Sequence, residues 1–129
     1  MSIAIVSTTK TLKRNNAVKL NFKALSALAS GDKQYESGRY GAQLVSDKND
    51  SRTAIVIKNT HSADVSVNLA QGNSPYCAES PLVISVPTAS EVVIVPDSAL
   101  YKDLSIDGYV LYTTDANFAK IEVACIALP

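Results

Sequence analysis

The chain has 129 residues, of which 47% are hydrophobic and 19% charged, and its formal net charge is zero. This composition is typical of one globular domain and excludes a disordered chain. A neutral chain also lacks the bulk attraction of a basic protein for nucleic acid or membranes, so neither is expected as a partner. No apolar run approaches the ~20 residues that span a bilayer, and the first residues lack a signal-peptide pattern, so we expect a protein used without secretion.

The zero net charge conceals an uneven distribution of charged residues. Residues 1–31 carry five basic residues and no acid, whereas residues 32–129 carry seven basic residues and twelve acids. The first segment is therefore +5 and the remainder −5, and such a split indicates an arm whose partner has the opposite charge. We predict a basic N-terminal arm, or first strands, at 1–31 and a β-sandwich domain at 32–129.

The first segment contains three short patterns. Apolar residues alternate with other residues at 3–5 and again at 18–22, and each set predicts a short strand. Residues 22–29 can instead form a short helix, because their larger apolar residues are three apart and Gly31 follows where a C-terminal cap belongs. Residues 31–41 are polar and are expected to form turns.

The clearest strand pattern lies at 53–60, after a polar loop at 47–51. It has β-branched residues on both faces and ends in a polar Lys-Asn-Thr turn, which predicts a central strand that is buried on both sides. Residues 65–69 alternate between apolar and polar and predict a half-buried strand. Residues 71–80 follow as a polar loop.

Two further strands are predicted at 81–86 and 91–95. Their four-residue spacing is that of a β-hairpin. Residues 96–101 then predict a single helical turn, which Asp97 or Ser98 can cap.

The last strands are expected at 106–112, with Gly108 at a bulge, and at the end of the chain, where Ile121, Val123 and Cys125 share one face. Turns every 8–12 residues and the lack of a long helix predict an all-β fold, an antiparallel β-sandwich with an N-terminal arm. The pattern leaves open an immunoglobulin-like or a jelly-roll topology.

No catalytic or metal-binding constellation stands out in the sequence. His61 is the only histidine and is expected in an exposed turn, and Cys77 and Cys125 are expected to be small core residues. Neither zinc nor EF-hand spacing is present. We therefore expect no enzyme activity, no metal and no cofactor. The acids expected in loops, as ordinary solvated charges, are Asp97, Asp103, Asp107 and Asp115.

Four of the six tyrosines fall in predicted loops or corners. Tyrosine combines apolar area with one hydroxyl, so it suits protein interfaces and stacking against glycans, and it also packs loops locally. The four residues are Tyr35, Tyr40, Tyr76 and Tyr101.

Several strand and turn motifs follow one another between residues 50 and 129. They are Arg-Thr-Ala-Ile-Val-Ile-Lys-Asn-Thr at 52–60, the alternating strand at 64–69, Leu-x-Ile-x-Val-Pro-x-x-x-Glu-Val-x-Ile-Val at 82–95, Pro-Asp-Ser at 96–98, Asp-Gly-Tyr at 107–109 and Leu-Pro at 128–129. In these motifs the chain resembles small capsid decoration (auxiliary or cement) proteins of tailed bacteriophages. The motifs are structural and carry no catalytic signature.

The resemblance implies a β-sandwich that binds the outer surface of an assembled capsid and reinforces it. The implied partner is the major capsid protein. Self-association, for example as a trimer, is a further possibility that the resemblance leaves undecided. The implied location is the virion, after synthesis in the host cytoplasm. We expect the basic arm to dock on an acidic groove of the shell. The residues expected to bind are Ile3, Ile5, Lys10, Lys13, Arg14, Lys19, Phe22 and Lys23.

Two other classes of function fit the same sequence. One is a tail or head-fibre module of the virion, and the other is a carbohydrate-binding β-sandwich that uses its loop tyrosines. The lysines of the arm can also be the solvated face of two edge strands.

Overall fold

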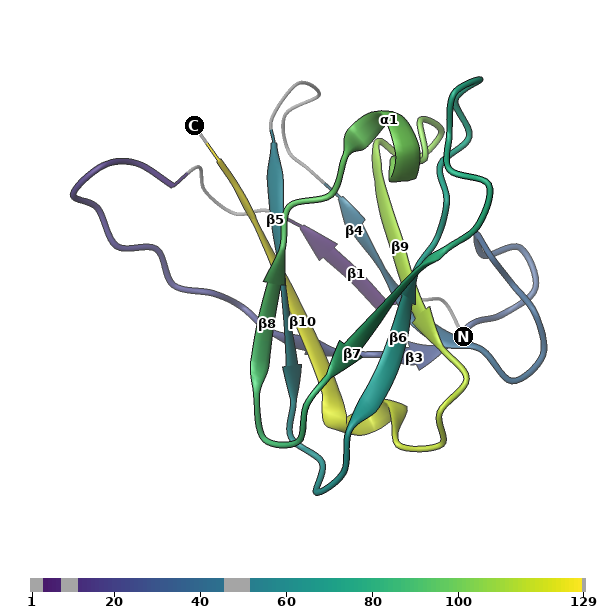
Figure 1. Cartoon of the computed structure of the whole chain (residues 1–129), viewed down its shortest axis with the longest axis horizontal. Helices are drawn as coiled ribbons and strands as arrows, with labels where there is room; N and C mark the ends of the chain where they lie inside the picture. Colours follow the sequence, from purple (N-terminus) through teal and green to yellow (C-terminus); the bar gives the residue numbers. More distant parts are fainter. Residues whose placement is uncertain (1–3, 8–11, 46–51, 129) are drawn as a thin grey trace.

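The computed structural model describes residues 4–7, 12–45 and 52–128, and the structural statements below concern these residues. Two β-sheets pack face to face around one hydrophobic core, which confirms the predicted all-β sandwich (Figure 1). Within these ranges, helical structure is confined to α1 (Ser98–Tyr101) and the 3-10 turn η1 (Phe118–Lys120). The same residues contain no helix of the length and hydropathy that a membrane crossing requires.

The larger sheet has the strand order β1-β4-β9-β6-β7, with β3 also paired to β4, and the smaller sheet has the order β2-β10-β5-β8. The strands are β1 (Ala4–Ser7), β2 (Lys23–Ala24), β3 (Ser26–Ala27), β4 (Tyr40–Val45), β5 (Thr53–Asn59), β6 (Val65–Leu69), β7 (Leu82–Val86), β8 (Glu91–Ile94), β9 (Gly108–Thr113) and β10 (Ile121–Ala127).

Four antiparallel strand pairs are nested one inside the other along the chain. The innermost pair is β6 with β7, followed outward by β5 with β8, β4 with β9, and β2 with β10. Successive pairs alternate between the two sheets, like a long hairpin folded over on itself. This connectivity is that of a jelly roll and differs from that of an immunoglobulin domain. The structure thus decides between the two topologies that the sequence leaves open.

The core is built from the inward-facing positions of both sheets. On β6, Val65, Val67 and Leu69 are at most 1% exposed, whereas Ser66 between them faces solvent, as the alternating pattern predicts. Burial of each such aliphatic side chain contributes roughly 1.5–3 kcal/mol. The largest fully buried side chains are Leu44, Ile55, Ile57, Leu69, Leu111 and Ile121.

Strand β5 occupies the interior of the smaller sheet, between β10 and β8. Ile55 and Ile57 face the core and are fully buried, and Ala54 and Val56 on the opposite face are only 5% and 6% exposed. The prediction of a central strand buried on both sides is therefore confirmed. Its polar end does not form a turn, because Asn59 is still part of β5 and is 1% exposed.

The predicted hairpin between 81–86 and 91–95 is wrong. Strand β7 pairs with β6 in the larger sheet and β8 with β5 in the smaller one, so residues 87–90 cross from one sheet to the other. Asn59 fixes this crossing: its side-chain amide donates to Val86 O (3.0 Å) and its backbone N–H donates to Ser90 O (2.9 Å). The alternating pattern could not reveal this, because both strands face the same core in either arrangement.

Part of the first segment belongs to the body of the fold. Strand β1 pairs in parallel with β4, which departs from a purely antiparallel sandwich, and Val6 of β1 is 2% exposed in the core. Residues 18–22 form no regular strand and lie in an extended loop, so the strand predicted there is wrong. Of the strand predicted at 3–5, Ile3 lies outside the described residues.

The helix predicted as an alternative at 22–29 is also wrong. Residues 23–27 form a strand segment that switches sheets, since β2 pairs with β10 and β3 with β4. Leu25 at the switch donates its backbone N–H to Ile121 O (3.1 Å) and enters the core, while Leu28 packs with Val110 and Tyr112 in a second cluster. Pairing with two sheet edges overrides the weak helical spacing of these residues.

Strand β4 was not expected, because residues 31–41 are rich in polar and turn-forming residues. It pairs with β9 along its whole length. This pair also explains Gly108, which begins β9 and was expected at a bulge: a Cβ there would lie 2.2 Å from Leu44 O. The glycine therefore allows the two backbones to approach closely.

Candidate functional site

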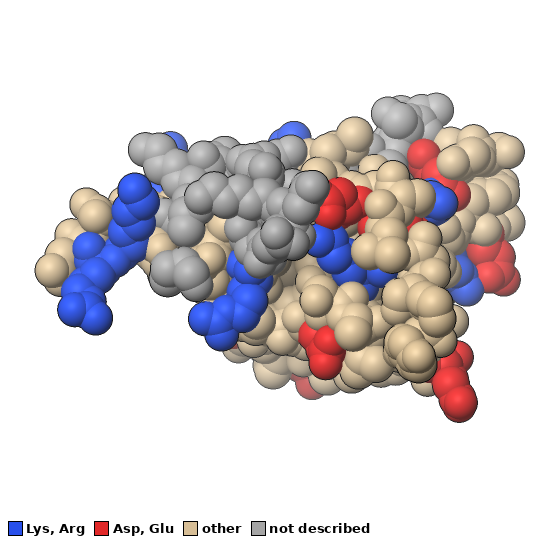
Figure 2. All heavy atoms as spheres, turned by 90° about the horizontal axis from the view of Figure 1, so that it is seen from above, with Lys and Arg blue, Asp and Glu red and all other residues tan. Residues whose placement is uncertain are grey.

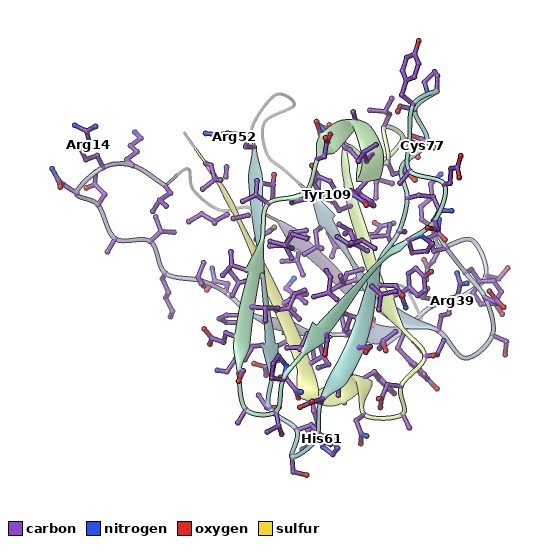
Figure 3. The ribbon with its side chains drawn as sticks, in the orientation of Figure 1. Arg14, Arg39, Arg52, His61, Cys77 and Tyr109 are labelled. Atoms are coloured by element: carbon purple, nitrogen blue, oxygen red, sulfur yellow. The ribbon has the colours of Figure 1, made fainter. Side chains whose placement is uncertain are left out.

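Two surface regions differ from the rest of the sandwich. The first is a projecting segment at residues 12–22, which we call the basic loop. The second is a hollow between α1 and the segments at 71–80 and 102–107, which we call the rim hollow. They lie toward opposite ends of the longest axis of the molecule (Figures 1 and 3).

The basic loop leaves the body and returns to it along the same strand, β10. Leu12 donates its backbone N–H to Ala127 O (2.8 Å) near the end of β10, and Lys23 pairs with Val123 on the same strand. A turn reverses the chain between these anchors, where Asn16 donates to Lys13 O (3.2 Å) and Asn15 has a φ of 62°. Asparagine tolerates this left-handed conformation better than most residues. Figure 1 shows the loop projecting well beyond the sheets.

The charge of the basic loop is uncompensated by any acid within it. Lys13, Arg14 and Lys19 are exposed, and the sequence from 12 to 31 contains no Asp or Glu. Arg14 lies near the tip of the loop, far from the sheets (Figure 3). In the view from above, basic side chains occupy this end of the molecule and the acidic ones lie on the body (Figure 2).

The structure separates the residues expected to bind a partner into three groups. Lys13, Arg14 and Lys19 project from the basic loop, whereas Ile3 and Lys10 lie outside the described residues. The other three, Ile5, Phe22 and Lys23, lie against the body.

Contacts at the base of the loop fix this third group. Lys23 Nζ donates to Ile5 O (2.8 Å), which joins β2 to β1. The Lys58 Nζ lies 5.4 Å from the ring centroid of Phe22, a cation–π contact with the central strand β5. The side chain of Ile5 is 50% exposed. Lys23 and Phe22 therefore anchor the loop, and the exposed cations lie farther out.

The rim hollow is held in shape by hydrogen bonds between its three segments. Leu100 O accepts from Gly72 N (2.9 Å) and from Ala78 N (3.0 Å), which attaches the 71–80 segment to α1. Asn73 donates to Asp103 Oδ1 (3.1 Å) and accepts from Leu104 N (2.8 Å). Asp97 caps α1 by accepting from Ala99 N, as the sequence predicts.

The hollow has a volume of about 540 Å³ and opens to solvent. Lys102 Nζ and Asp107 Oδ1 form an ion pair (2.8 Å) in its wall. Two bulky side chains at the hollow are open to solvent: Tyr76 is 84% exposed and Leu104 62%. The residues that line the hollow include Ser74, Tyr76, Ser98, Lys102, Leu104 and Asp107.

Tyr109 lies close to this end of the sandwich and is 4% exposed. Burial raises the pKa of its phenol above 10.0, and the negative charges of Asp97 and Asp107 raise it further. The phenol is therefore neutral at physiological pH and serves as part of the core.

The loop tyrosines have different environments. Tyr40 stacks on Phe118 with ring centroids 3.8 Å apart, and Tyr101 packs against the core, so local packing explains both. Tyr35 is 48% exposed, and Tyr76 is the most exposed of the large hydrophobic side chains in the described chain. Exposure of Tyr76 was not evident from its sequence context alone.

The residues considered for chemistry lie apart from one another. His61 is half-buried in the turn after β5, and its backbone N–H donates to Asn59 Oδ1 (2.8 Å). Cys125 is in the core, as expected, whereas Cys77 is half-buried in the 71–80 segment, so its expected core position is wrong. In the part of the chain that the structure describes, no three His, Cys, Asp or Glu residues group as a metal site.

The geometry thus offers a basic loop and a braced hollow as binding surfaces. No protein-family model, curated protein or solved structure matches this chain.

Proposed function

We propose that this protein is a non-enzymatic virion component that binds the outer surface of an assembled bacteriophage capsid and stabilises the shell. The observation that carries the proposal is the basic loop, which presents Lys13, Arg14 and Lys19 on a segment that projects from a net acidic body. The resemblance of residues 50–129 to capsid decoration proteins supports it. The proposed partner is the major capsid protein.

The anchoring of the loop at both ends favours binding. A free arm loses conformational entropy at each residue that it orders on docking, whereas a loop with both ends fixed has less to lose. The hydrogen bond from Leu12 to Ala127 and the pairing of Lys23 with Val123 supply these fixed ends. Half-buried Val18 and Leu20 add apolar surface beside the cations.

Individual charge contacts of this kind are weak, at roughly 0.2–1 kcal/mol for an exposed pair. Several contacts made at once, either by one loop or by several copies on a symmetric shell, raise the overall affinity because later contacts are intramolecular. Binding through the basic loop therefore predicts a marked dependence on ionic strength.

We propose the basic loop, rather than the whole of residues 1–31, as the binding segment. Strand β1 contributes Val6 to the core, and residues 23–27 pair with both sheets. Deletion of the arm would therefore remove core residues together with the loop. Charge reversal within the loop tests the proposal without that complication.

The test is co-sedimentation of the purified protein with undecorated phage heads. The wild-type protein is expected to saturate at a fixed ratio to the major capsid protein. Arg14→Glu and Lys19→Glu are each expected to weaken binding by roughly 3–30-fold, which corresponds to about 0.7–2 kcal/mol for one reversed contact. Lys120→Glu is the matched control, because Lys120 is exposed at η1 and its substitution changes the net charge equally.

Equal losses for Lys120→Glu and Arg14→Glu would refute a role of the loop and point to a general charge effect. Protein found at one vertex or on the tail would refute shell decoration and support a tail or head-fibre module. Self-association, with a trimer as one option, is checked in the same preparation by sedimentation velocity.

A further inference from the structure

We infer that the rim hollow is a binding site for a neutral oligosaccharide, with Tyr76 as the stacking platform. This inference is independent of how the protein attaches to a particle, because the hollow and the basic loop share no residue.

Tyr76 is the first argument for a ligand. A ring that is 84% exposed leaves most of its apolar surface in water, whereas Tyr109 and Tyr112 of the same chain bury theirs. Exposed aromatic rings on braced loops are favourable contact surfaces, since they combine a large apolar area with few rotatable bonds. The apolar C–H face of a pyranose ring matches such a surface.

The second argument is the mixed chemistry of the hollow. Ser74 and Ser98 contribute hydroxyl groups, and Leu104 adds an exposed apolar side chain. Ser74 Oγ donates to Ala99 O (2.9 Å), so its oxygen retains lone pairs that can accept from a ligand hydroxyl. A sugar presents both kinds of group, an apolar ring face and a polar rim.

The third argument concerns charge. Lys102 and Asp107 form a pair at 2.8 Å in the wall of the hollow, so their charges balance. An anionic ligand would have to compete with Asp107 for the ammonium group, and a cationic ligand would compete with Lys102. A neutral ligand can instead hydrogen-bond to the carboxylate of Asp107, whose side chain is 36% exposed, while the pair itself stays intact.

The fourth argument is preorganisation. The bonds of Leu100 O to Gly72 and Ala78, and those of Asn73 to the 102–107 segment, hold the rim in one shape before any ligand arrives. A braced rim loses little conformational freedom on binding. This matters for a sugar, whose hydroxyls exchange bonds with water for bonds with protein at little net gain.

The position of the hollow allows the two surfaces to work together. Figure 3 places Arg14 at one end of the molecule and Cys77, which is the neighbour of Tyr76 in the chain, toward the other. If the basic loop faces a particle, the hollow faces away from it and is open to glycans in the surroundings.

The test is titration of the isotope-labelled full-length protein, followed by its amide resonances. The probes are four neutral oligosaccharides: maltohexaose, cellohexaose, mannohexaose and chitohexaose. At least one is expected to bind with a Kd below ~1 mM and to shift resonances of 72–78 and 98–107 selectively. Tyr76→Ala is expected to weaken this binding at least ~10-fold, and Tyr76→Phe, which keeps the ring, to retain most of it.

Tyr35→Ala is the matched control, since Tyr35 is also exposed but lies outside the hollow. The Tyr35→Ala variant is expected to bind the oligosaccharide as tightly as the wild type does. Three results would overturn the inference: no resonance shifts with any probe at ~10 mM, binding that Tyr76→Ala leaves unchanged, or loss of capsid binding by Tyr76→Ala. The last result would assign the hollow to a protein contact instead. Circular dichroism of each variant verifies that the sandwich is folded.

Discussion

Asn59 provides the sharpest test of how the two sheets are joined. Its side chain is buried where β5, β6 and β7 meet, and it donates to Ala63 O (2.9 Å) and Val86 O (3.0 Å) and accepts from His61 N (2.8 Å). Asn59→Ala removes these three hydrogen bonds, each of which contributes about 1 kcal/mol, and desolvated backbone groups left behind add to the loss. We expect the free energy of unfolding to fall by about 3–5 kcal/mol.

The assay is equilibrium unfolding in urea, followed by circular dichroism. With an m-value of about 1.5 kcal/mol/M, a loss of about 3 kcal/mol lowers the midpoint by about 2 M. Asn117→Ala is the matched control: Asn117 is exposed before η1, so its midpoint is expected to change by less than about 0.3 M. If Asn59→Ala unfolds within 0.3 M of the wild type, on the order of the control's shift, Asn59 does not hold the crossing between the sheets.

Three further predictions concern strand pairing and the core. Gly108→Ala is expected to lower the free energy of unfolding by about 3 kcal/mol or more, because the new Cβ would meet Leu44 O; an unchanged urea midpoint would contradict the close approach of β4 and β9. Val6→Ala is expected to lower the free energy of unfolding by about 2 kcal/mol and Ile5→Ala by less than about 1 kcal/mol, since Val6 is 2% and Ile5 50% exposed. Equal decreases of the two variants in urea unfolding would show that β1 does not join the core. Because burial raises the pKa of Tyr109 above 10.0, its phenol ionises more readily in the unfolded chain, so stability is complete below about pH 10 and declines above it. Absorbance at alkaline pH should show a tyrosine ionisation above pH 10.0 in the folded protein, and Tyr109→Phe should remove that step.

Local patterns predicted most of the interior of the fold. The two-faced β-branched run at 53–59 became the central strand, and the alternation at 65–69 became a half-buried strand. The helical turn capped by Asp97 was also predicted, because capping depends only on neighbouring residues. Each of these features is determined within a few residues of the chain.

Features that depend on distant residues were not predictable from local pattern. The crossing at 87–90 depends on Asn59, which lies almost 30 residues earlier, and the strand switch at Leu25 depends on pairing with β10 and β4. Strand β4 has few β-branched residues and is stabilised by its partner β9. The predicted binding residues fall into an anchoring group and a projecting group, and the sequence could not separate the two. A charge pattern identifies the cations, but it does not show which of them contact distant strands and anchor the loop. The rim hollow unites three segments and had no continuous signature.

The nesting of the strand pairs has a consequence for the order in which the chain can fold. Strands β6 and β7 are joined by a connection of only twelve residues, 70–81. Strand β2, in contrast, pairs with β10, which lies about 100 residues later in the chain. During synthesis, β2 has no partner until the ribosome has released residue 123, so the outermost pair forms last and high contact order makes that step slow. The basic loop lies between Leu12 and Lys23, and both residues are hydrogen-bonded to or paired with β10. A chain that has not completed its fold therefore cannot present the loop in its final shape.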